Sequence, residues 1–363
     1  MKVDYQRRLA SLRERIKAAE IDALIVSEPH NIFYLSGSNG GFTGAKVRLV
    51  IDANTSTLII DYRYFDEALE MAVADRIIGW EKPSLSEVVD IVRDYGAVKI
   101  GFESTHITVK QYEQMVKEFE GIQLVGVSGL VEPLREVKDD YEIQEIGEAA
   151  AIGDAAFEHI LTYIKPGVSE LELVIEIEFF MRRRGAEKPS FDTIVASGVH
   201  SAVPHATPTT KRVKAGDFVK LDFGAVIGGY HSDMTRTVVV GEASQKQREL
   251  YAKVREAQKV ALDAVTPGKT GKEIDNVARD IISDAGYGEN FTHNLGHGVG
   301  LNVHELPVLG AGGETELKKN MVVTVEPGIY VSGFGGVRIE DLVVVTETGY
   351  RILTHSTKEL LEL

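Results

Sequence analysis

Two aspartates flank a predicted β-hairpin in the second half of this 363-residue chain. The segment 220–240 reads KLDFGAVIGGYHSDMTRTVVV, in which Gly228 and Gly229 supply a turn. Asp222 and Asp233 lie at nearly equal distances from that turn, so we expect them within reach of each other on neighbouring strands. Apolar residues bracket Asp222, which predicts that its carboxylate is buried. A buried carboxylate needs a partner.

A second predicted hairpin carries two glutamates in the same way. The segment 322–345 reads VVTVEPGIYVSGFGGVRIEDLVVV, and Glu326 and Glu340 are equally far along the chain from Gly333 in its turn. Valine and isoleucine surround both acids, so neither should lie alone. Independent surface acids are the alternative interpretation, but two such hairpins in one chain favour a shared site.

The histidines cluster near these acids in the sequence. Six of the ten histidines fall between residues 200 and 304. His297 stands in LGHGVGL, where flanking glycines allow close backbone approach and leave the imidazole accessible. The chain has no cysteine, so Asp, Glu and His must supply any metal ligands. Four carboxylates and one imidazole suit a pair of divalent ions, with zinc, manganese, cobalt or iron(II) all possible. The expected chemistry is attack by metal-activated hydroxide on a carbonyl or phosphoryl centre.

Two helix pairs accompany the two hairpins. Apolar spacing predicts helices over 141–164, 169–184, 244–265 and 270–285. Capping boxes at Ser169 with Glu172 and at Thr270 with Glu273 mark the starts of the second and fourth helices. Helices combined with antiparallel hairpins give an α+β fold, and the repetition of helix pair and hairpin hints at a duplicated half.

The chain is predicted to contain two domains. Residues 1–128 alternate short apolar strands with helical segments, which is typical of a small α/β domain. Residues 129–140 mix glycine, proline and charge and are the expected linker. Residues 141–363 then form the α+β domain that holds the acids and histidines.

Composition limits the classes of partner. The formal net charge is −15, which argues against affinity for nucleic acid or an anionic membrane. Hydrophobic residues make up 44% and charged residues 26%, values typical of a globular protein. The first twenty residues are amphipathic and charged, unlike a secretion signal. We therefore expect a soluble, cytoplasmic protein with no nucleic-acid or membrane partner.

The combination of motifs resembles the metallopeptidases of the pita-bread fold, which include methionine aminopeptidase, aminopeptidase P and Xaa-Pro dipeptidase (prolidase). LDFG, SDMTRT, GHGVGL, VEPG and VRIED follow the order and spacing of that family's metal signature. FDTIVASG, SAVPH and the N-terminal α/β domain are similar to the aminopeptidase P and prolidase branch. The resemblance covers essentially the full length of the chain.

The resemblance implies two divalent ions (Mn, Co, Zn or Fe(II)) held by five residues. Asp222 would bind one ion, and His297 with Glu326 the other. Asp233 and Glu340 would bridge both ions. Glu326 would also act as the general base.

The resemblance also implies residues around the ligands. His205 and His304 match histidines that contact substrate and stabilise the tetrahedral intermediate, and His293 matches a third histidine of the pocket. Tyr330 and Arg338 match positions behind the ligands. Plain sheet packing for Tyr330 and a surface ion pair for Arg338 are equally open interpretations.

The substrate implied by the resemblance is a dipeptide or short peptide with proline in second position, cut between residues one and two by a metal-bridging hydroxide. Its Xaa-Pro bond is a tertiary amide with no N–H, so it escapes peptidases that rely on that donor, and the pocket must accept a rigid ring. Archaeal prolidases carry HExPR at the second catalytic histidine, whereas this chain has Val308 in place of that arginine. Without such a clamp for a carboxylate, dipeptidase and aminopeptidase activity both stay open. We expect a homodimer, as is usual for the family.

Two alternatives come from other functional classes. One is a non-catalytic pita-bread module that binds peptides or proteins, and the other is a creatinase-like C–N hydrolase that works without metal. Both lack the metal-ligand set, so the intact set in this chain argues against them.

Overall fold

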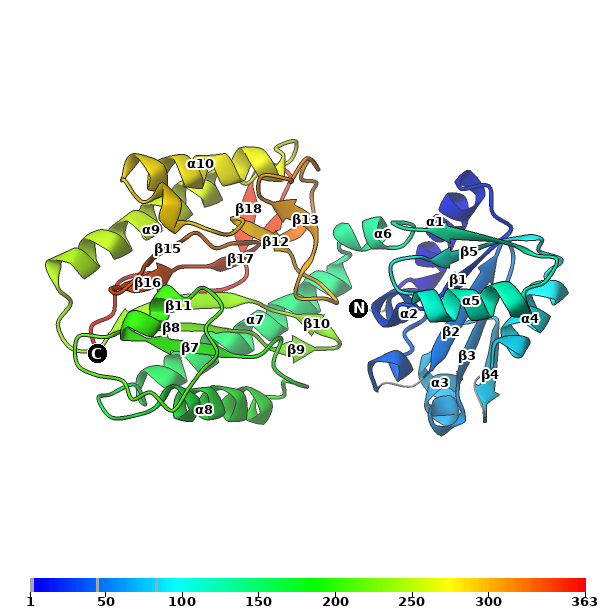
Figure 1. Cartoon of the computed structure of the whole chain (residues 1–363), viewed down its shortest axis with the longest axis horizontal. Coiled ribbons are helices and arrows are strands. Elements are labelled where there is room, and N and C mark those ends of the chain that lie inside the picture. The colour runs from blue at the N-terminus through cyan, green and yellow to red at the C-terminus, as the bar shows by residue number, and fades with distance from the viewer. Residues whose placement is uncertain (1–2, 44–45, 82–83) are drawn as a thin grey trace. The chain divides into compact units, whose positions relative to one another are not determined.

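The computed structural model describes residues 3–43, 46–81 and 84–363. The chain divides into two compact units between Arg135 and Glu136 (Figure 1). The segment 129–140, expected as a linker, contains both this division and helix α6 (Glu132–Glu136). None of the helices among the described residues has the length and apolar character that a membrane crossing requires.

The first unit is an α/β domain with one six-stranded sheet in the order β4-β3-β2-β1-β5-β6. Strand β1 pairs antiparallel with β2 and parallel with β5. Apolar side chains of α4 and α5 cover one face of this sheet and form its core. The strands are β1 (Ala23–Val26), β2 (Val47–Asp52), β3 (Ser56–Asp61), β4 (Arg76–Trp80), β5 (Lys99–Glu103) and β6 (Gln123–Val127). The helices are α1 (Tyr5–Ala18), α2 (Pro29–Ser36), α3 (Phe65–Met71), α4 (Leu85–Asp94) and α5 (Val109–Glu118).

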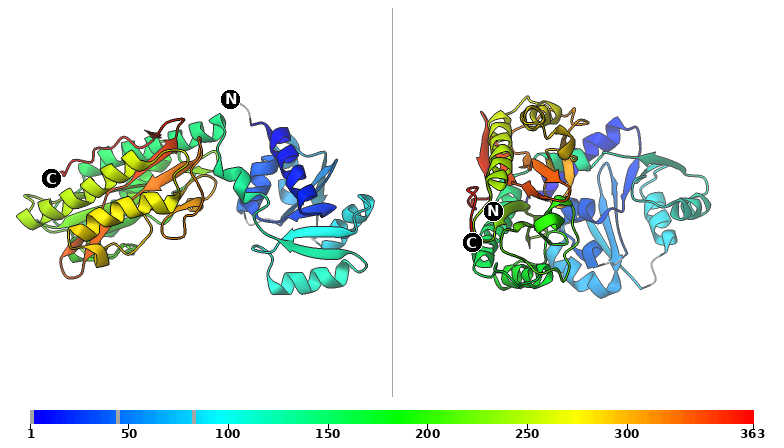
Figure 2. Two further views of the ribbon diagram at one scale, coloured as in Figure 1. Left: turned by 90° about the horizontal axis from the view of Figure 1, so that it is seen from above. Right: turned by 60° about the vertical axis from the view of Figure 1, so that its left-hand side comes forward.

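The second unit has two helix pairs on opposite faces of its strands (Figure 1). The helices are α7 (Asp140–Leu161), α8 (Glu170–Arg183), α9 (Gln245–Ala264) and α10 (Gly271–Asp284). Capping boxes open α8 at Ser169 and α10 at Thr270, which confirms the predicted starts. Helices α9 and α10 run side by side (Figure 2). The α+β prediction for this unit is therefore confirmed.

The strands of the second unit form a three-stranded sheet, a five-stranded sheet and two short hairpins. The three-stranded sheet, in the order β11-β8-β7, packs against α7 and α8. Helices α9 and α10 pack against strands of the five-stranded sheet and of the β15–β16 hairpin. The strands are β7 (Ile194–Ser197), β8 (Phe218–Phe223), β9 (Val226–Ile227), β10 (Tyr230–His231), β11 (Met234–Val239), β12 (Gly296–Gly298), β13 (Glu305–Leu309), β14 (Val322–Val325), β15 (Gly328–Val331), β16 (Gly335–Arg338), β17 (Asp341–Val345) and β18 (Tyr350–Ile352).

The first predicted hairpin is interrupted beside its aspartates. Strands β8 and β11 pair with Asp222 opposite Thr235, and β9 with β10 continue the same register to the glycine turn. Asp233 lies in the break, two residues before the partner of Asp222, so the two acids are diagonal neighbours on adjacent strands. The strands approach closely there: a Cβ at Gly224 would lie 1.8 Å from the Ser232 carbonyl oxygen.

The second hairpin is interrupted at its glutamates. Val325 pairs with Asp341 on one side of the break, and Gly328 pairs with Arg338 on the other. Both ladders keep one register, which places Glu326 and Glu340 opposite each other in the gap, as their equal spacing predicted. In each hairpin the strand pairing is thus interrupted at one or two of the acids: at Asp233 in the first hairpin, and at Glu326 and Glu340 in the second.

Candidate metal centre

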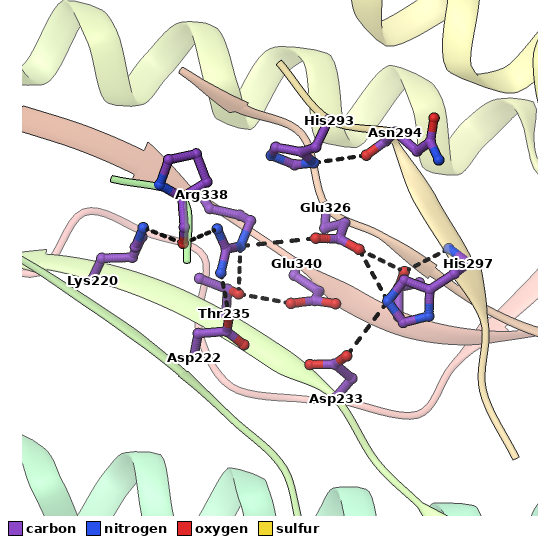
Figure 3. Close-up of polar contacts among 12 residues, drawn as sticks. Lys220, Asp222, Asp233, Thr235, His293, Asn294, His297, Glu326, Arg338 and Glu340 are labelled. Atoms are coloured by element: carbon purple, nitrogen blue, oxygen red, sulfur yellow. Dashed lines mark hydrogen bonds and ion pairs between the residues drawn. The ribbon is translucent and has the colours of Figure 1, made fainter. Parts of the chain in front are cut away.

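The two hairpins and strand β12 bring three ligand types together. One ligand atom each from Asp233, His297 and Glu340 lies within 4.8 Å of the others. Both acids are buried, and His297 is partly buried. The three side chains point toward one another in Figure 3. Such a group could hold a metal ion.

Glu326 and Asp222 adjoin this group. The Nε2 atom of His297 is 3.2 Å from Glu326 Oε1 and 3.6 Å from Asp233 Oδ2. Asp222 forms an ion pair with Arg338, whose Nε is also 3.9 Å from Glu326 Oε2. The surface ion pair considered for Arg338 is wrong, because its guanidinium is buried among the acids of the site.

The electrostatics of the acids indicate a missing positive charge. Burial and the charges of Glu340, Asp222 and Glu326 raise the pKa of Asp233 well above its usual value. Burial and neighbouring acids also raise the pKa of Glu340, and among the residues that the structure describes none hydrogen-bonds to its Oε1. A divalent cation would satisfy that oxygen and remove the repulsion, so the residues fit a metal site.

Glu326 differs from the other two acids. Burial alone would raise its pKa, but the hydrogen bond and charge of His297, together with the charges of Arg338 and His293, outweigh burial and lower the pKa of Glu326 to about 2. In return, Glu326 raises the pKa of His297 against the opposing effect of burial. Glu326 is therefore an ionised carboxylate at neutral pH.

Two threonines that the sequence interpretation missed hold the acids in place. Thr235 Oγ1 donates to Glu340 Oε2 at 2.7 Å and accepts from Arg338 Nε at 2.9 Å. Thr324 Oγ1 donates to Glu326 Oε1 at 3.1 Å. Each threonine stands two positions from an acid of its own hairpin. Because side chains alternate along a strand, that spacing is the signal that could have identified them.

The three expected histidines and the acids of the centre line one cavity of about 830 Å³. Arg338 links His293 to the centre through Tyr330: Arg338 Nη1 donates to the Tyr330 hydroxyl at 2.7 Å, and that hydroxyl lies 2.9 Å from His293 Nε2. The ring of His304 lies 4.2 Å from that of His297. Burial lowers the pKa of both His293 and His304, so these imidazoles are neutral at pH 7. The apolar part of the lining consists of Phe191, Ile194, Ala206, Pro208, Leu306 and Val308.

Comparison with known proteins agrees with this geometry. Residues 144–347 match Metallopeptidase family M24, and residues 8–137 match the Creatinase/Prolidase N-terminal domain. The chain therefore belongs to the M24 metallopeptidases of the pita-bread fold.

Several similar proteins carry more specific names. The structure of an Xaa-Pro dipeptidase from Bacillus anthracis is 44% identical with a TM-score of 0.95, over 99% of this chain and 100% of that one. The Xaa-Pro dipeptidase of Pyrococcus furiosus is 40% identical over 98% of this chain and 99% of its own length. An X-Pro aminopeptidase structure from Thermotoga maritima is 36% identical with a TM-score of 0.88, over 96% and 100% of the two chains.

Proposed function

We propose that this protein is a metal-dependent exopeptidase that hydrolyses the N-terminal Xaa-Pro bond of dipeptides or short peptides. The observation that carries the proposal is the buried group of Asp233, His297 and Glu340 at a cavity lined by three more histidines. The names of the similar proteins support proline in the second position of the substrate.

The proposed centre holds two divalent ions (Mn, Co, Zn or Fe(II)). Asp222 would serve one ion, His297 and Glu326 would serve the other, and Asp233 and Glu340 would serve both. Ions held there would act as Lewis acids that polarise the scissile carbonyl and acidify a water molecule. Arg338 already neutralises Asp222 in part, which limits the negative charge that the ions must balance.

Glu326 is the proposed general base. It is ionised at neutral pH, and the Thr324 hydroxyl fixes one of its oxygens, so it can accept a proton from water in a defined direction. It then returns that proton to the leaving proline nitrogen. Like any amide nitrogen, the proline nitrogen needs this added proton to leave as a neutral amine.

The histidines are proposed to bind the substrate. Neutral His304 can donate a hydrogen bond to the oxygen that gains negative charge in the tetrahedral intermediate, and His293 lines the same pocket. His205 lines the same cavity and is assigned to the same task. The apolar residues of the lining offer a surface for the proline ring.

The length of the peptide is the open part of the proposal. Val308 lines the cavity and offers no charge to a substrate carboxylate. The similar proteins carry both the dipeptidase and the aminopeptidase name. The homodimer and the cytoplasmic location stay predictions of the sequence.

The test is peptide hydrolysis by purified protein loaded with manganese or cobalt. We expect free alanine from Ala-Pro, from Ala-Pro-Ala or from both, and none from the control Ala-Ala. Cleavage of Ala-Pro alone identifies a dipeptidase. If neither proline peptide is cut while the metal is bound, the proposed function is refuted.

A further inference from the structure

Lys220 is completely buried in the middle of strand β8. The strand reads FVKLDF, and because side chains alternate between the two faces of a strand, Lys220 lies on the same face as Asp222. Burying a lysine is costly unless its amine makes hydrogen bonds. The partners of this amine therefore indicate what the residue does.

The Lys220 amine holds two carbonyl groups of one loop. Its Nζ donates to the carbonyl oxygen of Val203 at 2.7 Å and to that of Pro204 at 2.9 Å. Arg338 Nη1 donates to the same Pro204 oxygen at 3.2 Å, so the dashed lines from both side chains meet at one atom in Figure 3. The centroid of the Tyr330 ring lies 5.0 Å from Nζ.

His205 is the next residue of this loop, and the loop has little other support there. In the part of the chain that the structure describes, the backbone of residues 203–205 makes one further hydrogen bond, from the Val203 N–H to the His200 carbonyl at 3.0 Å. Residues 203–209 belong to no helix or strand. The two clamped carbonyls therefore fix the point from which the His205 side chain enters the cavity.

Neutralisation of the nearby acids is the other task that a buried lysine could have here. Among the described residues, however, Lys220 forms no ion pair with a carboxylate, and it is Arg338 that pairs with Asp222. A charged amine offers three N–H donors and a neutral one offers two, so either form can serve both carbonyls. Hydrogen bonding to the loop is thus the role that the contacts support.

We propose that Lys220 is a positioning residue for His205. It fixes the two peptide groups that precede the histidine, and Arg338 ties the same loop to Asp222. The reaction that Lys220 serves rests on the proposed function, whereas the clamp on the loop can be measured without any reaction.

The first experiment is the substitution Lys220→Met, which removes the donors and keeps a long side chain. Displacing a reacting group by about 1 Å can cost about a hundredfold in rate, so we expect kcat for the better proline peptide to fall about ten- to a hundredfold. Metal stoichiometry should be unchanged. The matched control is Gln258→Met on α9. Gln258 is also fully buried and donates a hydrogen bond to Asp341, but it does not line the cavity. This variant should keep the wild-type kcat.

A double-mutant cycle tests whether Lys220 acts through His205. In a His205→Ala background, adding Lys220→Met should have no further effect on kcat, because the positioned group is gone. If Lys220→Met lowers kcat by the same factor with and without His205, the proposal is overturned.

Hydrogen exchange tests the clamp itself. We expect residues 198–210 to exchange faster in Lys220→Met than in the wild type and in Gln258→Met, with the rest of the chain unchanged. Equal exchange in all three proteins would overturn the clamp, even if the wild type cuts neither proline peptide. If Lys220→Met does not fold, Lys220→Gln, which keeps a donor on a shorter side chain, undergoes the same measurements.

Discussion

At the scale of single residues, Val308 is the side chain that separates the two candidate activities. It lies in β13 and lines the cavity together with His304. A dipeptide places its carboxylate directly on the proline, whereas a longer peptide continues with an amide. A charged residue at position 308 would therefore act differently on the two substrates.

We predict that Val308→Arg shifts the enzyme toward dipeptides. A charge-assisted hydrogen bond contributes about 1.5–3 kcal/mol, so the ratio of kcat/KM for Ala-Pro over Ala-Pro-Ala should rise about tenfold or more. The control is Val308→Met, which is long and uncharged and should leave the ratio unchanged. An unaltered ratio in Val308→Arg would mean that position 308 does not face the substrate carboxylate.

At the scale of secondary-structure elements, Glu170 at the start of α8 connects the helix to both ends of the segment that carries His205. Its buried carboxylate accepts from Ser197 N at 2.8 Å and from Thr209 N at 3.1 Å, and it lies 3.0 Å from His200 Nδ1. Burial alone would raise the pKa of Glu170, but the hydrogen bonds of His200 and then Ser197 outweigh it and lower the pKa. The ionised form is therefore the one that stabilises the fold.

We predict that Glu170→Gln lowers the free energy of unfolding by about 1.5–3 kcal/mol at pH 7, the range for hydrogen bonds to a charged group. Because the folded pKa lies below the ordinary value of 4.5, this stabilisation is complete above that value and disappears as pH falls through the folded pKa. Urea unfolding from pH 7 down to pH 3 checks this. A difference between wild type and variant that stays constant over that range would contradict the role of the carboxylate charge.

At the scale of the whole molecule, the two units have separate hydrophobic cores. The only group of potential metal ligands found among the described residues lies in the second unit. The single tryptophan of the chain, Trp80, is buried in the first unit. Calorimetry therefore reports both units, whereas tryptophan fluorescence reports the first.

We predict that metal stabilises the second unit alone. At one hundred times the dissociation constant, a bound ion adds about 2.7 kcal/mol, which should raise one calorimetric transition by about 5–10 °C. The fluorescence transition of Trp80 should not move. In Glu340→Gln the metal-dependent shift should vanish. A shift of the fluorescence transition by the same amount would show that the two units unfold together.

The sequence by itself determined the residue types of the centre and the elements that carry them. Spacing along the second hairpin placed Glu326 opposite Glu340, because strand pairing has a fixed period and a glycine turn sets its register. Capping boxes located the starts of α8 and α10, because a cap involves residues only three apart. The spacing did not show the break in strand pairing beside Asp233, since the break at Gly224 depends on how closely two backbones approach.

Only the tertiary structure decided how these residues work together. The ion pair of Arg338 with Asp222 and the clamp of Lys220 on the loop before His205 join residues of different elements. No local period specifies such contacts, because they arise when separate elements fold onto a common core. The sequence thus specifies which residues can bind a metal and which strands carry them. The packing of the elements decides that Asp222 pairs with Arg338, whereas Asp233 and Glu340 face His297 in the potential metal site.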